Sequence, residues 1–182
     1  MAFNPNELPP GCGFHPTELE IITILRNRVL SQQGYPGVLE RNLYGPDATP
    51  WLILSEEDGT IPWQRVGNAV DIGKKVYVFT VAPRLGNGSQ RDRSAGCGSW
   101  VPRTGPRNVM DGGGLQVGTR RSLSFQPRTE QYGRDRWVMH EYELDDSQLN
   151  PGQTTDLVLC RVAKYPDVEP QIPDLNFAEE DN

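Results

Sequence analysis

The feature that most constrains the fold is a series of strand-like segments after residue 74, with no helical pattern between them. Residues 76–79 form a short apolar run, residues 115–125 alternate between apolar and polar, and residues 137–144 and 157–162 are two further apolar segments. Strands that follow one another without crossover helices predict an antiparallel sheet. The 19 glycines and 16 prolines favour short strands joined by loops. We therefore expect an α+β fold that is mainly β, a twisted antiparallel sheet flanked by a few helices.

One amphipathic helix is predicted before these strands. Thr17 and Glu20 have the spacing of a capping box, in which each side chain binds the other residue's backbone N–H. Apolar residues then recur every four positions, at Ile21, Leu25 and Val29, and so mark one buried face. Gly34 and Pro36 are expected to end the helix. The sequence Ile61-Pro62-Trp63 suggests the start of a second short helix.

The length of 182 residues suits a single domain. We expect a polar arm over residues 1–7, one folded unit over 8–165, and an acidic, disordered tail over 166–182. A run of about 18 apolar residues is lacking, as is a basic start with an apolar signal region, so neither a membrane span nor secretion is expected. Three widely spaced cysteines, Cys12, Cys97 and Cys160, are no disulfide framework and favour a reducing compartment.

The charge is unevenly distributed along the chain. The formal net charge is −6, yet residues 74–140 hold 12 basic and 4 acidic side chains, whereas the segments before and after are both acidic. A local positive field attracts phosphate whatever the total charge of the protein. The middle third is therefore a candidate for binding nucleic acid, and the alternative is an ordinary solvated basic face.

Five sequence blocks resemble those of NAC transcription factors and follow one another in the family's order. The first comprises Leu8-Pro9-Pro10-Gly11 and Phe14-His15-Pro16-Thr17, and the second Asn42-Leu43-Tyr44 with Pro50-Trp51. The third runs from Asn87-Gly88-Ser89 to Trp100, the fourth from Val117 to Tyr142, and the last is Asp156-Leu157-Val158-Leu159-Cys160-Arg161-Val162. The resemblance spans residues 8–165.

This resemblance implies a nuclear, DNA-binding protein that forms homodimers or heterodimers with other NAC proteins. The residues themselves show no nucleophile in a recognised setting and no complete ligand set, so no catalytic residue, metal or other cofactor is expected. A sheet edge entering the major groove of double-stranded DNA would read bases, while flanking arginines hold phosphates. The DNA-binding candidates are Arg84, Arg91, Arg93, Arg103, Thr104, Arg107, Arg120 and Arg121. Candidates for the dimer contact are Leu8, Pro9, Pro10, Gly11, Phe14 and Glu20.

Two departures from the family pattern concern these functions. The family follows Trp with Lys-Ala-Thr-Gly in its DNA-reading strand, whereas here Trp100 precedes Val101-Pro102-Arg103-Thr104-Gly105-Pro106-Arg107. Prolines lack ladder donors, so this segment must be a sheet edge or a loop. The family also places an arginine where this chain has Gly13, which removes one charge from the dimer contact. An interaction protein that pairs with other transcription factors without reading DNA is therefore the alternative function.

Other readings of single motifs remain open. Cys12 and His15 have the spacing of half a zinc site, but no second pair completes it. Glu141 and Glu143 share a strand face like a glycosidase pair, but the neighbouring Asp145 and Asp146 favour a solvated acidic edge. The triple glycine at residues 112–114 leads into a strand, so a hairpin connection is favoured over a phosphate loop.

Overall fold

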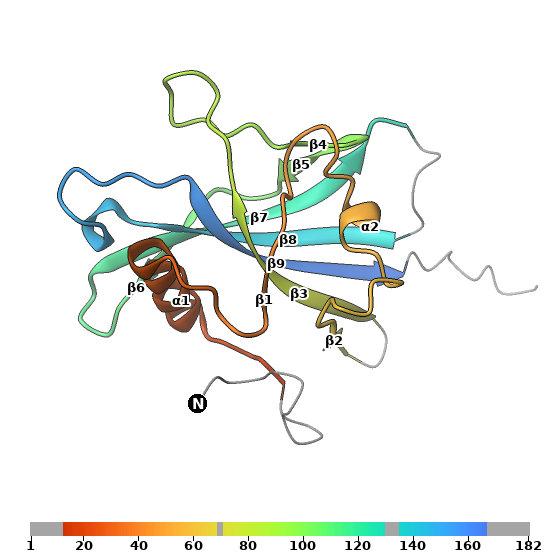
Figure 1. Cartoon of the computed structure of the whole chain (residues 1–182), viewed down its shortest axis with the longest axis horizontal. Coiled ribbons are helices and arrows are strands. Elements are labelled where there is room, and N and C mark those ends of the chain that lie inside the picture. The colour runs from red at the N-terminus through yellow and green to blue at the C-terminus, as the bar shows by residue number, and fades with distance from the viewer. Residues whose placement is uncertain (1–12, 69–70, 130–134, 167–182) are drawn as a thin grey trace, which may run out of the picture.

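The computed structural model describes residues 13–68, 71–129 and 135–166. These residues form one curled sheet with two helices against it (Figure 1). The helices are α1 (Glu18–Ser31) and α2 (Pro50–Ile53), with a 3-10 turn, η2 (Asp146–Gln148). The strands are β1 (Val38–Glu40), β2 (Gln64–Gly67), β3 (Ile72–Val81), β4 (Ser94–Ala95), β5 (Gly98–Pro102), β6 (Arg107–Met110), β7 (Gln116–Pro127), β8 (Asp135–Leu144) and β9 (Leu157–Pro166). The expected α+β, mainly β architecture is confirmed.

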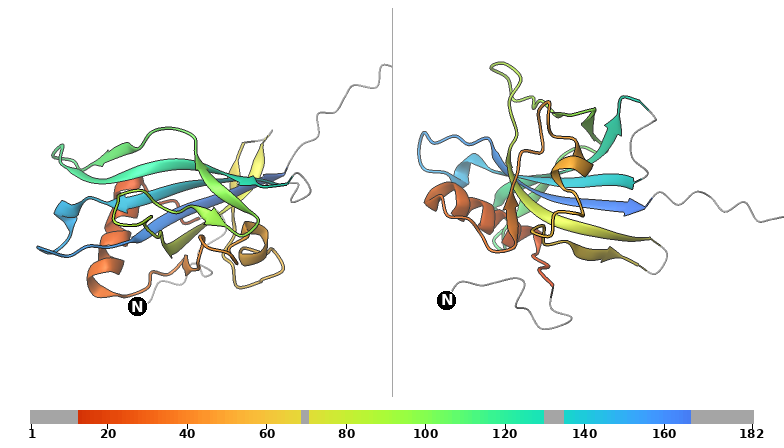
Figure 2. Two further views of the ribbon diagram at one scale, coloured as in Figure 1. Left: turned by 90° about the horizontal axis from the view of Figure 1, so that it is seen from above. Right: turned by 45° about the vertical axis from the view of Figure 1, so that its right-hand side comes forward.

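The sheet has the order β1-β3-β9-β8-β7-β5-β4, with β2 also on β3 and β6 also on β7. Every strand pair is antiparallel except β1 with β3, which is parallel and joins Leu39 to Val78. The long strands β3, β9, β8 and β7 form the centre, and Figure 2 shows their curl from above. The antiparallel prediction therefore holds for the central sheet, with one parallel strand at its border.

Helix α1 begins at the predicted capping box. The Thr17 hydroxyl accepts a hydrogen bond from the Glu20 N–H at 3.2 Å, and the Glu20 carboxylate accepts one from the Thr17 N–H at 2.7 Å. Ile21 and Leu25 are buried as expected. The helix ends at Gln32, whose φ of 57° is left-handed, two residues before the predicted Gly34.

The second predicted helix is in the wrong place. Residues 61–63 follow a turn in which the Ile61 N–H binds the Asp58 carbonyl, and Trp63 then leads into β2. Helix α2 instead starts at Pro50, where the fixed φ of proline suits the first helical position and its missing N–H costs nothing.

Each side of the sheet has its own apolar cluster, because neighbouring residues of a strand point to opposite faces. On one face, Val78, Met139 and Leu123 pack beneath residues 43–63, which include α2. On the other, which we call the α1 face, Ile21, Leu25 and their neighbours pack on Tyr77, Phe79, Tyr142 and Leu159. A Cβ atom at Gly118 would lie 2.4 Å from Ile22 Cδ1, so glycine lets α1 approach the sheet closely.

Two glycine-containing turns lie in connections between strands, and the triple glycine forms one of them as predicted. Asn87 and Gly88 lie in a tight turn that the Leu85 N–H closes on the Gln90 carbonyl at 2.7 Å. Residues 111–114 connect β6 to β7, with Gly114 at a φ of 81°. This triple glycine is a hairpin connection and does not open a helix.

Candidate nucleic-acid interface

The free edge of the sheet beside β7 is a single strand broken in the middle. β5 pairs with β7 up to Pro102, Arg103 donates its N–H to the Ser122 carbonyl at 2.8 Å, and β6 resumes pairing at Arg107. Thr104, Gly105 and Pro106 form the exposed break. The two prolines therefore lie at an edge and in a loop, as predicted, and residues 101–110 have no strand on their outer side in the described chain.

This edge carries arginines and no acid. Residues 93–110 and 116–129 contain six arginines and neither aspartate nor glutamate. Asp111, at the hairpin tip between them, accepts hydrogen bonds from the Gly113 and Leu115 N–H groups and so serves the turn itself. The edge is therefore basic along its length, although acids elsewhere in the fold reach several of its arginines.

Arg84 and Arg91 belong to an ion cluster at one end of the sheet. The Arg91 side chain is only 3% exposed and binds Glu143, Asp156 and the Ala82 carbonyl. Arg84 pairs with the same Asp156 at 2.6 Å. Arg91 is thus committed to holding its loop on the sheet, and we leave it out of the proposed interface.

Arg93 is committed in a similar way. Its guanidinium pairs at 2.7 Å with Glu141, which is 1% exposed and also accepts a hydrogen bond from the Tyr44 hydroxyl. Burial raises the pKa of Tyr44, and the Glu141 carboxylate raises it further. Glu141 therefore has a structural role, and Glu143 is taken up by Arg91, so the two do not form a free carboxylate pair.

Arg107 and Arg120 share one carboxylate. Glu18, at the start of α1, binds Arg120 at 2.6 Å and Arg107 at 3.1 Å. The Arg107 side chain is still 64% exposed, so it remains available at the surface. One acid on two arginines leaves this end of the edge with excess positive charge.

Arg120 and Arg121 point to opposite sides of the sheet. Arg120 is in register with Tyr142, on the α1 face, and Arg121 with Glu141, on the other face. Adjacent positions in the sequence therefore do not form one binding patch here. The family resemblance predicted that both arginines bind DNA, but strand alternation places their side chains on opposite faces of the sheet.

Three arginines of the edge make no ion pair with any described residue. They are Arg103, Arg121 and Arg128. Arg128 was not among the sequence candidates, yet it is exposed and its N–H binds the Cys97 carbonyl at the start of β5. The sequence signal that could have identified Arg128 is its position in the same acid-free stretch as the other edge arginines. Arg103, Thr104 and Arg107 are exposed, as a contact surface requires.

Most of the predicted dimer contact lies outside the described residues, namely Leu8, Pro9, Pro10 and Gly11. Phe14 is half-buried and packs edge-on against Tyr77, with ring centroids 5.0 Å apart. Glu20 is exposed, and its hydrogen bonds to Thr17 lower its pKa. Cys12, half of the conceivable zinc pair, is likewise outside the described ranges, while His15 contacts Lys75 through Nδ1 at 2.9 Å.

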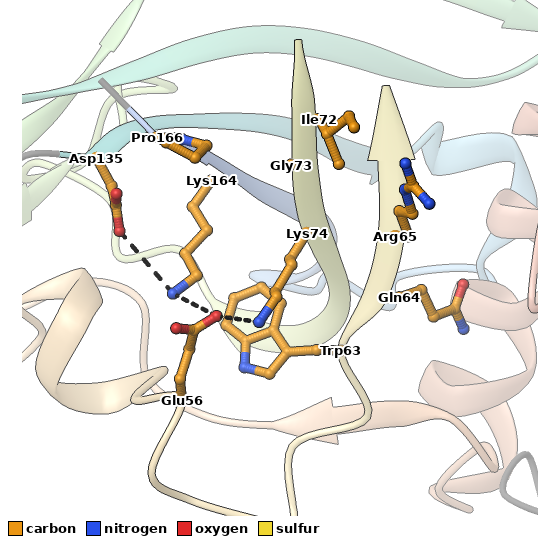
Figure 3. Close-up of a pocket in the computed structure, with 10 residues that line it drawn as sticks. All are labelled: Glu56, Trp63, Gln64, Arg65, Ile72, Gly73, Lys74, Asp135, Lys164 and Pro166. Atoms are coloured by element: carbon orange, nitrogen blue, oxygen red, sulfur yellow. Dashed lines mark hydrogen bonds and ion pairs between the residues drawn. The ribbon is translucent and has the colours of Figure 1, made fainter. Parts of the chain in front are cut away.

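A pocket of about 410 Å³ lies between β2, β3 and β9 (Figure 3). Glu56 pairs with both Lys74 and Lys164, and the Lys164 ammonium lies over the Trp63 ring, 5.2 Å from its centroid. Figure 3 shows these side chains converging on one another. The pocket is at the border of the sheet opposite the arginine edge, and we assign it no part in the interface.

The described residues hold no group of three or more His, Cys, Asp or Glu side chains arranged to bind a metal ion. Within the same ranges, no helix combines the length and apolar character needed to cross a membrane.

Comparison with known proteins supports the resemblance seen in the sequence. The family model described as No apical meristem (NAM) protein matches residues 9–144. NAC domain-containing protein 41 of Arabidopsis thaliana is 35% identical over 162 residues, covering 85% of this chain and 53% of that protein. NAC domain-containing protein 2 of Solanum lycopersicum is 32% identical over 188 residues, covering 97% of this chain and 62% of that protein. The chain thus spans about three fifths of these relatives or less, and it belongs to the NAC (No apical meristem) family.

Proposed function

We propose that this chain is a DNA-binding regulator of transcription that acts in the nucleus. The observation that carries the proposal is the open sheet edge over residues 101–110, which bears exposed arginines and lacks acidic residues. A sheet edge or two-stranded ribbon fits the major groove of B-form DNA, and duplex phosphates attract a basic edge at long range.

The roles divide by position along the edge. Arg103, Thr104 and Asn108 are exposed at and beside the break and are the proposed base-reading side chains, since arginine can bind guanine and asparagine can bind adenine with two hydrogen bonds. Arg107 and Arg128 flank them and bind phosphates, which fixes the register without reading sequence. Arg84, Arg93, Arg120 and Arg121 are then secondary, because their guanidinium groups are paired or lie away from the break.

Dimerisation is part of the proposal. Residues 8–14 with Glu20 form the contact, and the partner is a second copy or another NAC protein. An exposed ion pair is worth only about 0–1 kcal/mol, so Gly13 in place of the family arginine does not prevent association.

A second candidate function is an interaction protein that pairs with other NAC proteins without reading DNA. The observation that favours it is the internal pairing of Arg84, Arg91, Arg93, Arg107 and Arg120, five of the seven predicted arginines. Each internal carboxylate reduces the positive field that a duplex would meet. The two functions differ in the number of phosphates neutralised, which is measurable.

Salt dependence of duplex binding tests the proposal. The logarithm of affinity falls with the logarithm of salt by about 0.9 for each phosphate neutralised. We expect Arg107→Ala with Arg128→Ala, which removes both proposed phosphate contacts, to reduce this slope by about 2 in fluorescence anisotropy with a labelled duplex. Arg65→Ala is the matched control, because Arg65 is exposed, lies on β2 and makes no ion pair with a described residue. Equal slopes in the double variant and the wild type would reject this edge as the DNA site.

A further inference from the structure

A row of polar side chains crosses the α1 face beside α1. Tyr77, Arg161, His140 and Ser122 are successive cross-strand neighbours on β3, β9, β8 and β7. Arg103 continues the row through its bond to Ser122. Neighbouring strands are about 4.8 Å apart, so the row is about 20 Å long. We call it, with the adjacent Lys75 and Arg136, the basic stripe.

The basic stripe has few acidic partners. Arg136 pairs with Asp71 at 2.8 Å. Lys75, Arg103 and Arg161 form no ion pair with a residue in the described ranges, even though Lys75 is only 5% exposed. The Lys75 ammonium instead lies 2.9 Å from His15 Nδ1 and 3.5 Å from the Tyr77 hydroxyl, neither of which is acidic.

Burial, and after it the neighbouring guanidinium groups, lowers the pKa values of two titratable groups in the basic stripe. Burial and then the Arg161 guanidinium lower the pKa of Lys75 to about 8. Burial, followed by Arg120 and Arg161, lowers the pKa of His140 to about 4, against a smaller opposing effect of Glu18. The surface is also hollowed, since Arg103, Ser122, Arg136 and His140 line a depression of about 270 Å³. The positive charge of Arg103, unpaired within the described residues, and the depression beside it both suit an anionic ligand that enters from solvent.

The same chain contains a segment of complementary charge. Residues 167–182 hold six acidic side chains and no basic one. They follow directly on β9, which ends at Pro166 beside Asp135. The centroid of the Tyr165 ring, one residue before Pro166, lies 4.6 Å from the Arg136 guanidinium. The acidic segment therefore begins at the border of the basic stripe. Sixteen extended residues span about 50 Å, more than twice the length of the row.

We propose that the basic stripe binds residues 167–182 of its own chain, with their carboxylates paired to Arg103 and Arg161. Apolar residues of the segment, such as Ile172 and Leu175, accompany the carboxylates into the depression beside Val138. Because Arg103 also belongs to the DNA edge, the bound segment competes with duplex phosphates. This last consequence rests on the proposed function, whereas the intramolecular contact does not.

Nuclear magnetic resonance of the whole chain tests the contact. The test variant replaces the six acids by amides: Asp167→Asn, Glu169→Gln, Asp174→Asn, Glu179→Gln, Glu180→Gln and Asp181→Asn. At low salt we expect the side-chain N–H signals of Arg103 and Arg161 to differ between the wild type and the variant, and to coincide at about 0.5 M salt, where charges are screened within about 4 Å. The signal of Arg65, on β2, should not move. Identical Arg103 and Arg161 signals at low salt would overturn the proposal. A difference that grows with protein concentration would overturn the assignment to the same chain.

Duplex binding of the same two proteins tests the competition. The amide variant should bind a labelled duplex at least about threefold more tightly at low salt, because the wild-type edge is free for only part of the time. Equal affinity would refute the competition. If neither protein binds DNA, the proposed function fails, while the resonance shifts still decide whether the segment occupies the basic stripe.

Discussion

Replacement of Arg93 by alanine tests whether this arginine stabilises the fold through its ion pair with Glu141. The change leaves the Glu141 carboxylate, 1% exposed, with the Tyr44 hydroxyl as its remaining partner in the described chain. Removing one partner of a buried ion pair costs about 3–5 kcal/mol, because the other charge stays desolvated. For a domain of this size each kcal/mol lowers Tm by about 2–4 °C, so Arg93→Ala should lower it by about 6–20 °C in thermal unfolding followed by circular dichroism.

A second substitution identifies the cause. Glu141→Gln in the Arg93→Ala background removes the unpaired charge while keeping the shape, and should recover part of the lost stability. As an exposed comparison, Asp71→Asn acts on a pair with Arg136 whose side chains are about half exposed, and should cost no more than about 1 kcal/mol. The reasoning fails if Arg93→Ala unfolds at the wild-type temperature, or if the second substitution destabilises the protein further.

Two further changes test the packing and the charge of the α1 face. Gly118→Ala places a Cβ 2.4 Å from Ile22 Cδ1 and should destabilise the fold by about 1–3 kcal/mol in urea, whereas Gly105→Ala, with open space around it, should cost far less. His140 has a pKa of about 4 in the folded chain against 6.5 unfolded, so the unfolded chain binds more protons between these values. The free energy of unfolding should therefore fall on acidification from about pH 6.5 to 4, on the order of 2 kcal/mol at this partly buried side chain. His140→Gln should flatten that part of the pH profile, and an unchanged profile would contradict the assigned shift.

Local chemistry made the backbone of this protein largely predictable. The capping box at Thr17, the hairpin connection at residues 112–114 and the alternation of Thr119, Arg121, Leu123 and Phe125 each follow from nearest neighbours in the chain, and the structure confirms all three. The helix expected at residues 61–63 failed because local chemistry does not decide between two prolines. Proline suits the first turn of a helix at either place, and only burial of the chain over the sheet selects Pro50.

The site was less predictable because ion pairing is a long-range property. Arg91 is exposed or buried according to Glu143 and Asp156, which are more than 50 residues away in the sequence. No spacing rule links Glu18 to Arg107 and Arg120, since α1 and β7 meet only in the folded chain. The basic residues counted in the middle third of the sequence therefore overestimate the positive charge available to a ligand, because five of the predicted arginines are paired internally. Arg128, which has no such partner among the described residues, was not predicted.

Selection of duplexes from a random pool by this chain at near-physiological salt shows whether the open edge reads DNA. We expect enrichment of a short core, repeated as paired half-sites if the chain dimerises, and loss of the base preference nearest Arg103 in Arg103→Ala. A pool that stays unenriched, while the chain still associates with other NAC proteins, would contradict DNA reading by the open edge and support the interaction protein instead.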